Sequence, residues 1–389
     1  MQAGYSLTVI EPEGAKPSET VDYDLLRVRP VRLRRLAKGV WLFLRRLAPA
    51  LGEAWWTLIY ALGLLLTALR YARHALSQKA DVYQAHDLDT LGAAVVAGKL
   101  ARRPIIYDAH ELVSEQGDPH SLRNRFLRHL EQWLIPHVDR LLVPNLSRAH
   151  VYHQRYHLRA EPTVILNCPP RSPVVKTNTL RERLGLSAST RVVLYHGTLM
   201  AGRALEELVL AARGFEADIV LVIIGEQNAF YHDVLKPLWA RERLAERVLF
   251  LPYVPPDEIM SYVASADLGV VIYKNINLNN YLCAPTKLYE YFMAGVPVVA
   301  CDFPEMRSLL EEYPVGHLFD PDTPSSIADA VNEFLSKERD REDELRHTLS
   351  LARERFNWEA ESRKLLDVFT SLASVVGTTT AQRAVVSAP

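Results

Sequence analysis

The chain has 389 residues, a formal net charge of -1 and an apolar fraction of 49%. A single hydrophobic core rarely serves so long a chain, so we expect two globular domains of the cytosolic type. The near-neutral charge argues against a nucleic-acid-binding protein, and three scattered cysteines argue against a disulfide framework or a cysteine zinc site.

The first part of the chain combines one short strand with a basic and then an apolar segment. Ser6 to Ile10 is predicted to form the strand. Leu25 to Ala50 contains eight Lys or Arg and no acid, interleaved with apolar residues such as Trp41 and Phe43. A helix of this composition is typical of an anionic membrane surface, and the alternative is a solvated face over a domain core. The sixteen uncharged residues from Ala54 to Leu69 fall short of the ~20 that span a bilayer, so we expect burial against a sheet.

From Asp81 onward, short apolar runs alternate with helical patterns, which predicts a parallel sheet. Ligands bind beyond the carboxyl ends of such strands. The residues at these ends include His86 and Asp87 after one strand, and His110 and Glu111 after the next. A functional role for His86 competes with a simpler interpretation, in which Asp87 caps a helix and the histidine is a bystander.

A proline-rich segment is predicted to join two domains. Three prolines lie between Asn167 and Pro173 and cannot continue a helix or a central strand. We therefore assign residues 1–168 to an N-terminal domain, 169–175 to a linker and 176–372 to a C-terminal domain, with a disordered tail over 373–389. Strand–helix alternation restarts beyond the linker, so the fold class is α/β with two doubly wound, Rossmann-like domains.

The first strand of the second domain leads into a loop with the chemistry of a phosphate site. This strand, Arg191 to His196, is followed by Gly197, Gly202 and Arg203. Such a loop can bring backbone N–H groups and a guanidinium to a phosphate, although glycine-containing turns are common.

The stretch from Pro285 to Ala300 is predicted to be a loop, a short helix with a left-handed stop at Gly295, and a buried strand. Lys287 lies in the first helical turn, where the helix dipole disfavours a cation unless an anion is bound. Glu290 follows one turn later, so one helix face could hold a phosphate and a sugar hydroxyl. The alternative is an ordinary surface Lys–Glu pair.

These features resemble the retaining GT-B glycosyltransferases of the group 1 family over roughly residues 4–372. The resemblance rests on the Gly-x5-Arg loop at Gly197 and on Pro-x-Lys-x2-Glu-Tyr-x2-Ala-Gly-x-Pro-Val-Val at residues 285–299. It implies a UDP- or GDP-linked sugar as donor, with neither a metal nor another cofactor.

The resemblance also implies roles for individual residues. Glu290 would hold the ribose hydroxyls, and His110, Arg203 and Lys287 would be the catalytic group, with the two cations on the diphosphate. The remaining donor-binding residues would be Gly197, Thr198, Gly225, Tyr253, Val254, Thr286 and Leu288. Candidates on the acceptor side are His86, Asp87 and Glu111.

Three positions depart from the family pattern. Leu282 replaces an acid found in many members, and Thr198 replaces a second cation. The chain also begins at Gly4 to Ile10, which resembles the second strand of the family rather than the first. We therefore expect an unpaired gap in the middle of the N-terminal sheet and suspect a truncated reading frame.

Three functions remain compatible with the sequence. The first is a retaining glycosyltransferase of cell-surface polysaccharide or glycolipid synthesis, with a glycan or lipid-linked acceptor. The second is a catalytically inactive scaffold or regulatory subunit of a glycan-assembly complex. The third is another GT-B enzyme, such as a nucleotide-sugar epimerase, which residues 285–299 fit less well. The basic segment predicts a cytoplasmic protein held peripherally at the inner face of the plasma membrane.

Overall fold

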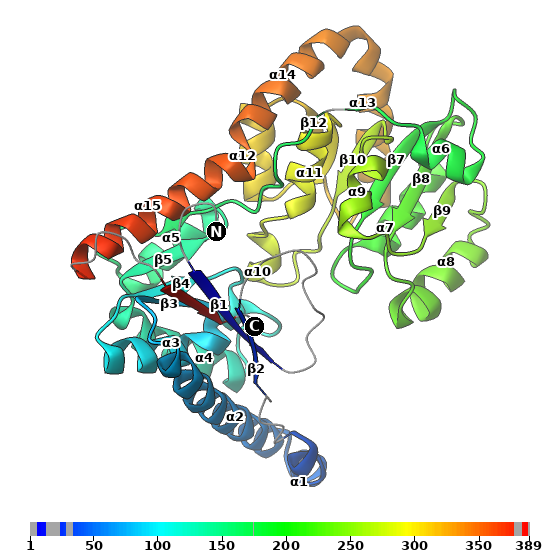
Figure 1. The fold of residues 1–389 in the computed structure, drawn as a ribbon. Coiled ribbons are helices and arrows are strands. Elements are labelled where there is room, and N and C mark those ends of the chain that lie inside the picture. The colour runs from blue at the N-terminus through cyan, green and yellow to red at the C-terminus, as the bar shows by residue number, and fades with distance from the viewer. Residues whose placement is uncertain (1–5, 13–23, 29–33, 174, 377–382, 388–389) are drawn as a thin grey trace. The chain divides into compact units, whose positions relative to one another are not determined.

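The computed structural model describes residues 6–12, 24–28, 34–173, 175–376 and 383–387, and the chain divides into two compact units (Figure 1). The first unit comprises residues 1–165 and 363–389, and the second comprises residues 166–362. Each unit is built on one parallel sheet with helices around it, which confirms the predicted fold class.

Within the described residues, the sheet of the first unit has seven parallel strands in the order β2-β1-β13-β3-β4-β5-β6. The strands are β1 (Ser6–Pro12), β2 (Asp24–Val28), β3 (Val82–His86), β4 (Ile105–Asp108), β5 (Arg140–Val143), β6 (Thr163–Val164) and β13 (Arg383–Ser387). The helices are α1 (Arg34–Leu47), α2 (Pro49–Ser77), α3 (Asp87–Ala101), α4 (Leu122–Leu134) and α5 (Leu146–Tyr156).

The strand β13 lies between β1 and β3 and runs parallel to both. Val385 is opposite Thr8 on one side and Tyr83 on the other. The gap expected in the middle of the sheet is therefore filled by a segment from the other end of the chain, and the predicted disorder is wrong for residues 383–387. The pairing provides hydrogen-bond partners for backbone groups of two strands that would otherwise be orphaned.

We expected the basic segment to form a helix, but its beginning is a strand. Residues Asp24–Val28 form β2, which pairs with β1 at the edge of the sheet. Leu26 is half-buried and Val28 buried, while Arg27 between them is exposed. This period of two favours a strand over a helix, and α1 begins only at Arg34.

The closing helix α15 (Trp358–Val376) passes from the second unit into the first. Buried side chains of its second half pack against β3, β4 and β5, and this cluster comprises Val82, Ile106, Leu142, Val368, Phe369 and Leu372. The predicted boundary at residue 372 is therefore wrong, since the second unit ends at Ser362. The predicted linker likewise belongs to the second unit, which begins at Leu166.

The helix α2 is much less buried than its apolar sequence led us to expect. In its apolar 18-residue stretch, only 6% of the residues are buried. Among the described residues, α2 is the one helix that is long and apolar enough to cross a membrane. One face packs against α3, where a Cβ on Gly92 would lie 3.4 Å from the Cβ of Ala68. The opposite face is exposed, so the predicted burial is wrong for that face.

The second unit contains a parallel sheet with the described strands in the order β12-β11-β10-β7-β8-β9. They are β7 (Arg191–His196), β8 (Ile219–Ile224), β9 (Val248–Leu251), β10 (Leu268–Val271), β11 (Val298–Cys301) and β12 (Gly316–Phe319). The helices are α6 (Thr179–Leu184), α7 (Leu205–Ala211), α8 (Lys236–Arg241), α9 (Pro256–Val263), α10 (Leu278–Tyr281), α11 (Thr286–Ala294), α12 (Pro304–Glu312), α13 (Pro324–Lys337) and α14 (Glu342–Arg355).

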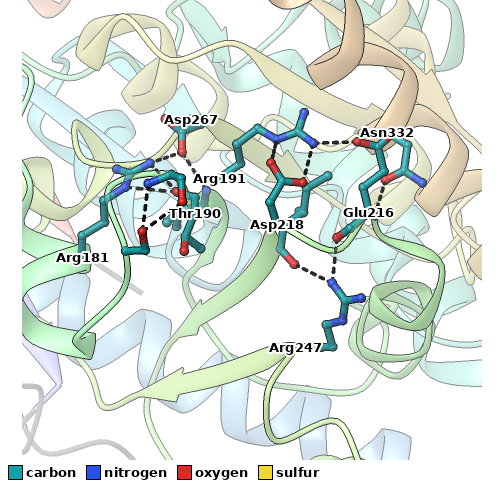
Figure 2. Close-up of polar contacts among 12 residues, drawn as sticks. Arg181, Thr190, Arg191, Glu216, Asp218, Arg247, Asp267 and Asn332 are labelled. Carbon is teal, nitrogen blue, oxygen red and sulfur yellow. Dashed lines mark hydrogen bonds and ion pairs between the residues drawn. The ribbon is translucent and has the colours of Figure 1, made fainter.

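A polar network fixes the amino ends of the central strands of this sheet (Figure 2). Asp267, just before β10, accepts a hydrogen bond from the backbone N–H of Val192 at 2.7 Å and pairs with Arg181. Arg191 holds Asp218 with two hydrogen bonds of 2.7 and 2.8 Å. The network stabilises the relative positions of the strands, whose opposite ends carry the loops of the candidate site.

We predict that removing residues 383–389 destabilises the first unit selectively. Buried backbone groups of β1 and β3 would lose their partners at about 1–3 kcal/mol each. Amide hydrogen exchange in β1 and β3 should accelerate about tenfold or more, while β7 and β8 keep their protection. Removal of residues 388–389 alone is the matched control. Unchanged protection of β1 and β3 after the longer truncation would contradict the β13 pairing.

Candidate functional site

The candidate site of the second unit is formed where the loops after β7 and β8 meet the start of α11. Gly197 has φ 130°, and a Cβ there would lie 3.1 Å from Nζ of Lys287. A Cβ on Gly225 would lie 2.5 Å from the carbonyl oxygen of Gly197. Both positions therefore require glycine, because any side chain would separate the two loops or displace the lysine.

Lys287 is a buried cation, with 8% of its surface exposed. Its Nζ lies 3.9 Å from the centroid of the Tyr195 ring. Burial, and secondly the charge of Arg203, lower the pKa of Lys287 to about 7, against an opposing effect of Glu290. A lysine with so low a pKa lacks sufficient compensating negative charge, so a bound anion would stabilise its protonated form.

Arg203 supplies a second cation on the same side of the unit. Its guanidinium carbon lies 4.1 Å from the centroid of the Tyr273 ring, and Nζ of Lys287 lies 5.9 Å from the same centroid. The aromatic face orients the guanidinium plane. Two cations over one ring are suited to the two phosphates of a diphosphate.

Glu290 lies beside a histidine that we did not predict from the sequence. Its Oε2 is 3.6 Å from Nε2 of His196, the last residue of β7. Burial raises the pKa of Glu290, and Lys287 opposes this shift. Burial and then Lys287 lower the pKa of His196 to about 3, so this imidazole is neutral. Among the described residues its Nε2 has no hydrogen-bond partner. Its place at the carboxyl end of a strand was the available sequence signal.

The other predicted donor-binding residues differ in exposure. Thr286 is exposed in the first turn of α11, whereas Leu288 is fully buried and can offer only backbone groups. Thr198 and Tyr253 are exposed, and Val254 is buried. The helix ends as predicted at Gly295, which has φ 70°. The structure thus gathers Gly197, Gly225, Arg203, Lys287 and Glu290, and the donor contacts of the remaining residues stay predictions.

A second polar cluster lies at the carboxyl ends of β3 and β4 in the first unit. His86 Nδ1 lies 2.7 Å from His110 Nε2, and the two rings stack with centroids 5.0 Å apart. Asp108 Oδ2 lies 3.5 Å from His86 Nδ1 and 3.4 Å from His110 Nε2. These three groups could also hold a metal ion, since their ligand atoms lie within 4.8 Å of one another.

The two histidines beside Asp108 differ in the direction of their pKa shifts. Burial lowers the pKa of His86 despite the opposing charge of Asp108. Burial also acts to lower the pKa of His110, but its hydrogen bond to Asp108 and the negative charges around it outweigh this effect and raise the pKa. The pair therefore favours a proton on His110, and Asp108, which we did not single out, orients that ring.

The simpler interpretation required Asp87 to cap α3, but the residue that precedes the helix is His86 and no side chain caps it. Asp87 is the first residue of α3 with φ 56°, and its Oδ1 accepts a hydrogen bond from the backbone N–H of Glu111 at 2.9 Å. Burial raises the pKa of Asp87 to about 6. Arg148, also missed, is buried, donates to the carbonyl oxygen of His110 and lies 3.4 Å from Glu111. The loop that carries His110 is therefore fixed from both sides.

Two family models match the chain. The model described as "Glycosyl transferases group 1" matches residues 176–351, and the "Glycosyl transferase 4-like domain" model matches residues 1–169. Together they cover both polar clusters and all the described strands of the two sheets except β13.

Curated relatives have low sequence identity to the chain. A D-inositol 3-phosphate glycosyltransferase of Thermobispora bispora is 26% identical over 258 residues, which are 62% of this chain and 58% of that protein. The enzyme of the same name from Corynebacterium diphtheriae is 25% identical over 293 residues, 68% of this chain and 65% of that protein. The chain thus spans less than two thirds of the length of these relatives.

Solved structures show the same fold. Anabaena HepE in complex with UDP-glucose has a TM-score of 0.67 at 17% identity, covering 94% of this chain and 100% of that one. Sucrose-phosphate synthase from Thermosynechococcus elongatus has a TM-score of 0.68 at 16% identity, covering 96% of this chain and 90% of that one.

We predict that anion binding at Lys287 depends on pH. A lysine with a pKa of about 7 loses its charge as the pH rises through that value, and a bound diphosphate favours the charged form. Pyrophosphate binding should therefore weaken between about pH 6 and about pH 8.5, with proton uptake on binding near pH 7.

Calorimetry in buffers of different ionisation enthalpy measures this proton uptake. Lys287→Arg stays charged over the whole range, so the difference between the two proteins removes the titration of pyrophosphate itself. Equal proton uptake by the wild type and Lys287→Arg would show that Lys287 does not titrate on binding.

Proposed function

The chain belongs to the group 1 glycosyltransferases with the GT-B fold, and from this premise we propose that it transfers a sugar from a nucleotide-sugar donor to a glycan or lipid-linked acceptor. We include retention of the anomeric configuration and a role in cell-surface polysaccharide or glycolipid synthesis in this proposal. The observation that carries it is the buried Lys287, whose depressed pKa calls for an anion beside Arg203.

In the proposed reaction, negative charge develops on the departing nucleoside diphosphate. Lys287 and Arg203 stabilise that charge from fixed positions, together with the backbone N–H groups at the start of α11. Because the cations are held in place by Tyr195 and Tyr273, little reorganisation accompanies bond cleavage. Glu290 accepts hydrogen bonds from the two ribose hydroxyls. The UDP-glucose bound by HepE supports a UDP-linked donor, and a GDP-linked donor is the alternative.

We assign His110 to the sugar that is transferred. With Asp108 beside it and a raised pKa, the imidazole can donate a hydrogen bond to a sugar oxygen. His86, Asp87 and Glu111 line the same strand ends and are proposed to contact the acceptor.

One observation favours the inactive scaffold as a second candidate. Leu282, where many family members have an acid, is buried and apolar, and Thr198 adds no charge to the phosphate loop. Donor turnover by the purified protein separates the two candidates, because a scaffold would not cleave the donor.

We propose that the protein works in the cytoplasm at the inner face of the plasma membrane, where a lipid-linked acceptor is available. The support is the basic helix α1, which contains five Lys or Arg and no acid. Its attraction to anionic lipid is worth about 1 kcal/mol per basic residue near the surface.

We predict that Lys287→Ala and Glu290→Gln each lower donor turnover about tenfold to a hundredfold, since a charge-assisted contact contributes about 1.5–3 kcal/mol. The matched control is another Lys–Glu pair of the same unit, Lys337 and Glu333, which are joined at 2.6 Å on an exposed helix face. Lys337→Ala and Glu333→Gln should turn over donor like the wild type. Wild-type turnover by both site variants would contradict the site assignment.

We predict that EDTA leaves donor turnover unchanged. Lys287 and Arg203 supply the positive charge that a metal ion would otherwise supply. Asp302, just after β11, is already paired with Arg307, and Asp267, paired with Arg181, lies at the amino end of β10 and away from the site. Turnover is compared with EDTA, with added Mg²⁺ and untreated. A complete loss that metal restores would contradict the prediction and point to a metal-dependent reaction.

A further inference from the structure

We propose that the exposed apolar face of α2 inserts into the headgroup and upper acyl region of an anionic membrane. The helix would then lie parallel to the bilayer and hold the first unit at its surface. This inference rests on the membrane location proposed above and deepens it, because it names the face that meets the lipid. It also changes the main force, from charge attraction by α1 to burial of apolar surface by α2.

The apolar face is a row of five leucines along α2, called here the leucine stripe. Their side chains are 41% to 60% exposed, and they are Leu51, Leu58, Leu62, Leu65 and Leu69. Steps of seven, four, three and four residues place them on one side of the helix. Eighteen residues of helix extend about 27 Å, so the stripe is a long continuous apolar surface rather than scattered exposure.

The opposite face of α2 is attached to the first unit along its whole length. Near its start, Glu53 accepts a hydrogen bond from the backbone N–H of Leu122 at 2.6 Å. In its middle, the hydroxyl of Tyr60 donates to Asp89 at 3.0 Å, and near its end Tyr71 is buried. Lipid cannot surround a helix that is bonded to protein in this way. The helix therefore lies along the membrane rather than across it, although it is long enough to span.

The charges around the stripe select an anionic lipid surface as the occupant. Five Lys or Arg lie in α1 and two in α2, against Glu53 as the one acid of the two helices. The stripe itself contains no Lys or Arg between Leu51 and Leu69. The exposed cations lie before and after it, and they are Lys38, Arg45, Arg46, Arg70 and Arg73. Such flanking side chains can reach the phosphate level while the leucines enter the apolar layer.

A pocket of about 380 Å³ between α1, α2 and residues 116–124 fits the same occupant. Its walls include Trp41 and Trp56, whose ring centroids are 5.7 Å apart. Its two carboxylates, Glu53 and Asp118, already accept backbone N–H bonds. Of its two arginines, Arg123 already donates to Asn124 at 3.1 Å, so Arg45, whose guanidinium carbon lies 5.2 Å from the Trp41 ring centroid, is the charge that a lipid phosphate would meet. Tryptophan and arginine together are typical of the headgroup level of membranes.

The test is flotation of the full-length protein with phosphatidylcholine vesicles, with and without phosphatidylglycerol, at about 0.1 M and about 1 M NaCl. The stripe variant is Leu58→Gln/Leu62→Gln/Leu65→Gln. The matched control replaces three exposed leucines elsewhere, Leu100→Gln/Leu146→Gln/Leu351→Gln, which are 69%, 70% and 50% exposed.

The wild type and the matched control should float with anionic vesicles at both salt concentrations. The stripe variant should bind about tenfold or more weakly at low salt and be lost at high salt, since only charge attraction remains. Equal flotation of the stripe variant and the matched control would overturn the proposal. So would a wild-type dimer, seen by sedimentation velocity, that the stripe variant abolishes while neither protein binds vesicles, because the stripe would then join two copies.

A nucleotide thermal shift keeps this inference distinguishable from the proposed function. A stripe variant that unfolds at the wild-type temperature and is stabilised by UDP or GDP, yet does not float, supports the inference with the donor site intact. A wild type that floats but is stabilised by neither nucleotide contradicts the proposed donor chemistry and leaves the membrane inference standing.

Discussion

The site of the second unit depends on a lysine ammonium that is buried without enough negative charge around it. Lys287 is held over Tyr195, and a Cβ at Gly197 would lie 3.1 Å from its Nζ, so a side chain there would push the ammonium out of place. Gly225 in turn approaches the backbone of Gly197. The loops after β7 and β8 therefore pack closely against each other and against Lys287 at the start of α11. A bound diphosphate would supply the negative charge that Lys287 lacks.

In the first unit, by contrast, the groups that can carry a positive charge lie beside a carboxylate. Asp108 lies beside His86 and His110, and it determines which of the two rings holds a proton more strongly. Arg148 and Asp87 hold the loop around His110 through backbone contacts. The first unit therefore carries a polarised imidazole, and the second unit carries fixed cations.

The sequence was sufficient where the determining signals are local. Strand–helix alternation predicts both parallel sheets, and the spacing of Lys287, Glu290 and Gly295 predicts a short helix with its functional residues on one face. Features that depend on distant segments were missed. The five residues of β13 have no periodic signal, and their pairing joins positions almost 380 residues apart. The apolar composition of α2 cannot show which face meets protein, and the neutral state of His196 depends on its burial.

The position of β13 also bears on how the protein folds during synthesis. The first unit is built from segments before and after the second unit, whereas the second is continuous from Leu166 to Ser362. On the ribosome, the second unit can therefore fold before β13 is available to pair with β1 and β3. Completion of the first sheet requires that residues 383–387 have left the exit tunnel, so this sheet is completed only after the whole second unit has been synthesised, through contacts of very high sequence separation. Until then β1 and β3 expose unpaired strand edges, and such edges can pair with strands of other chains.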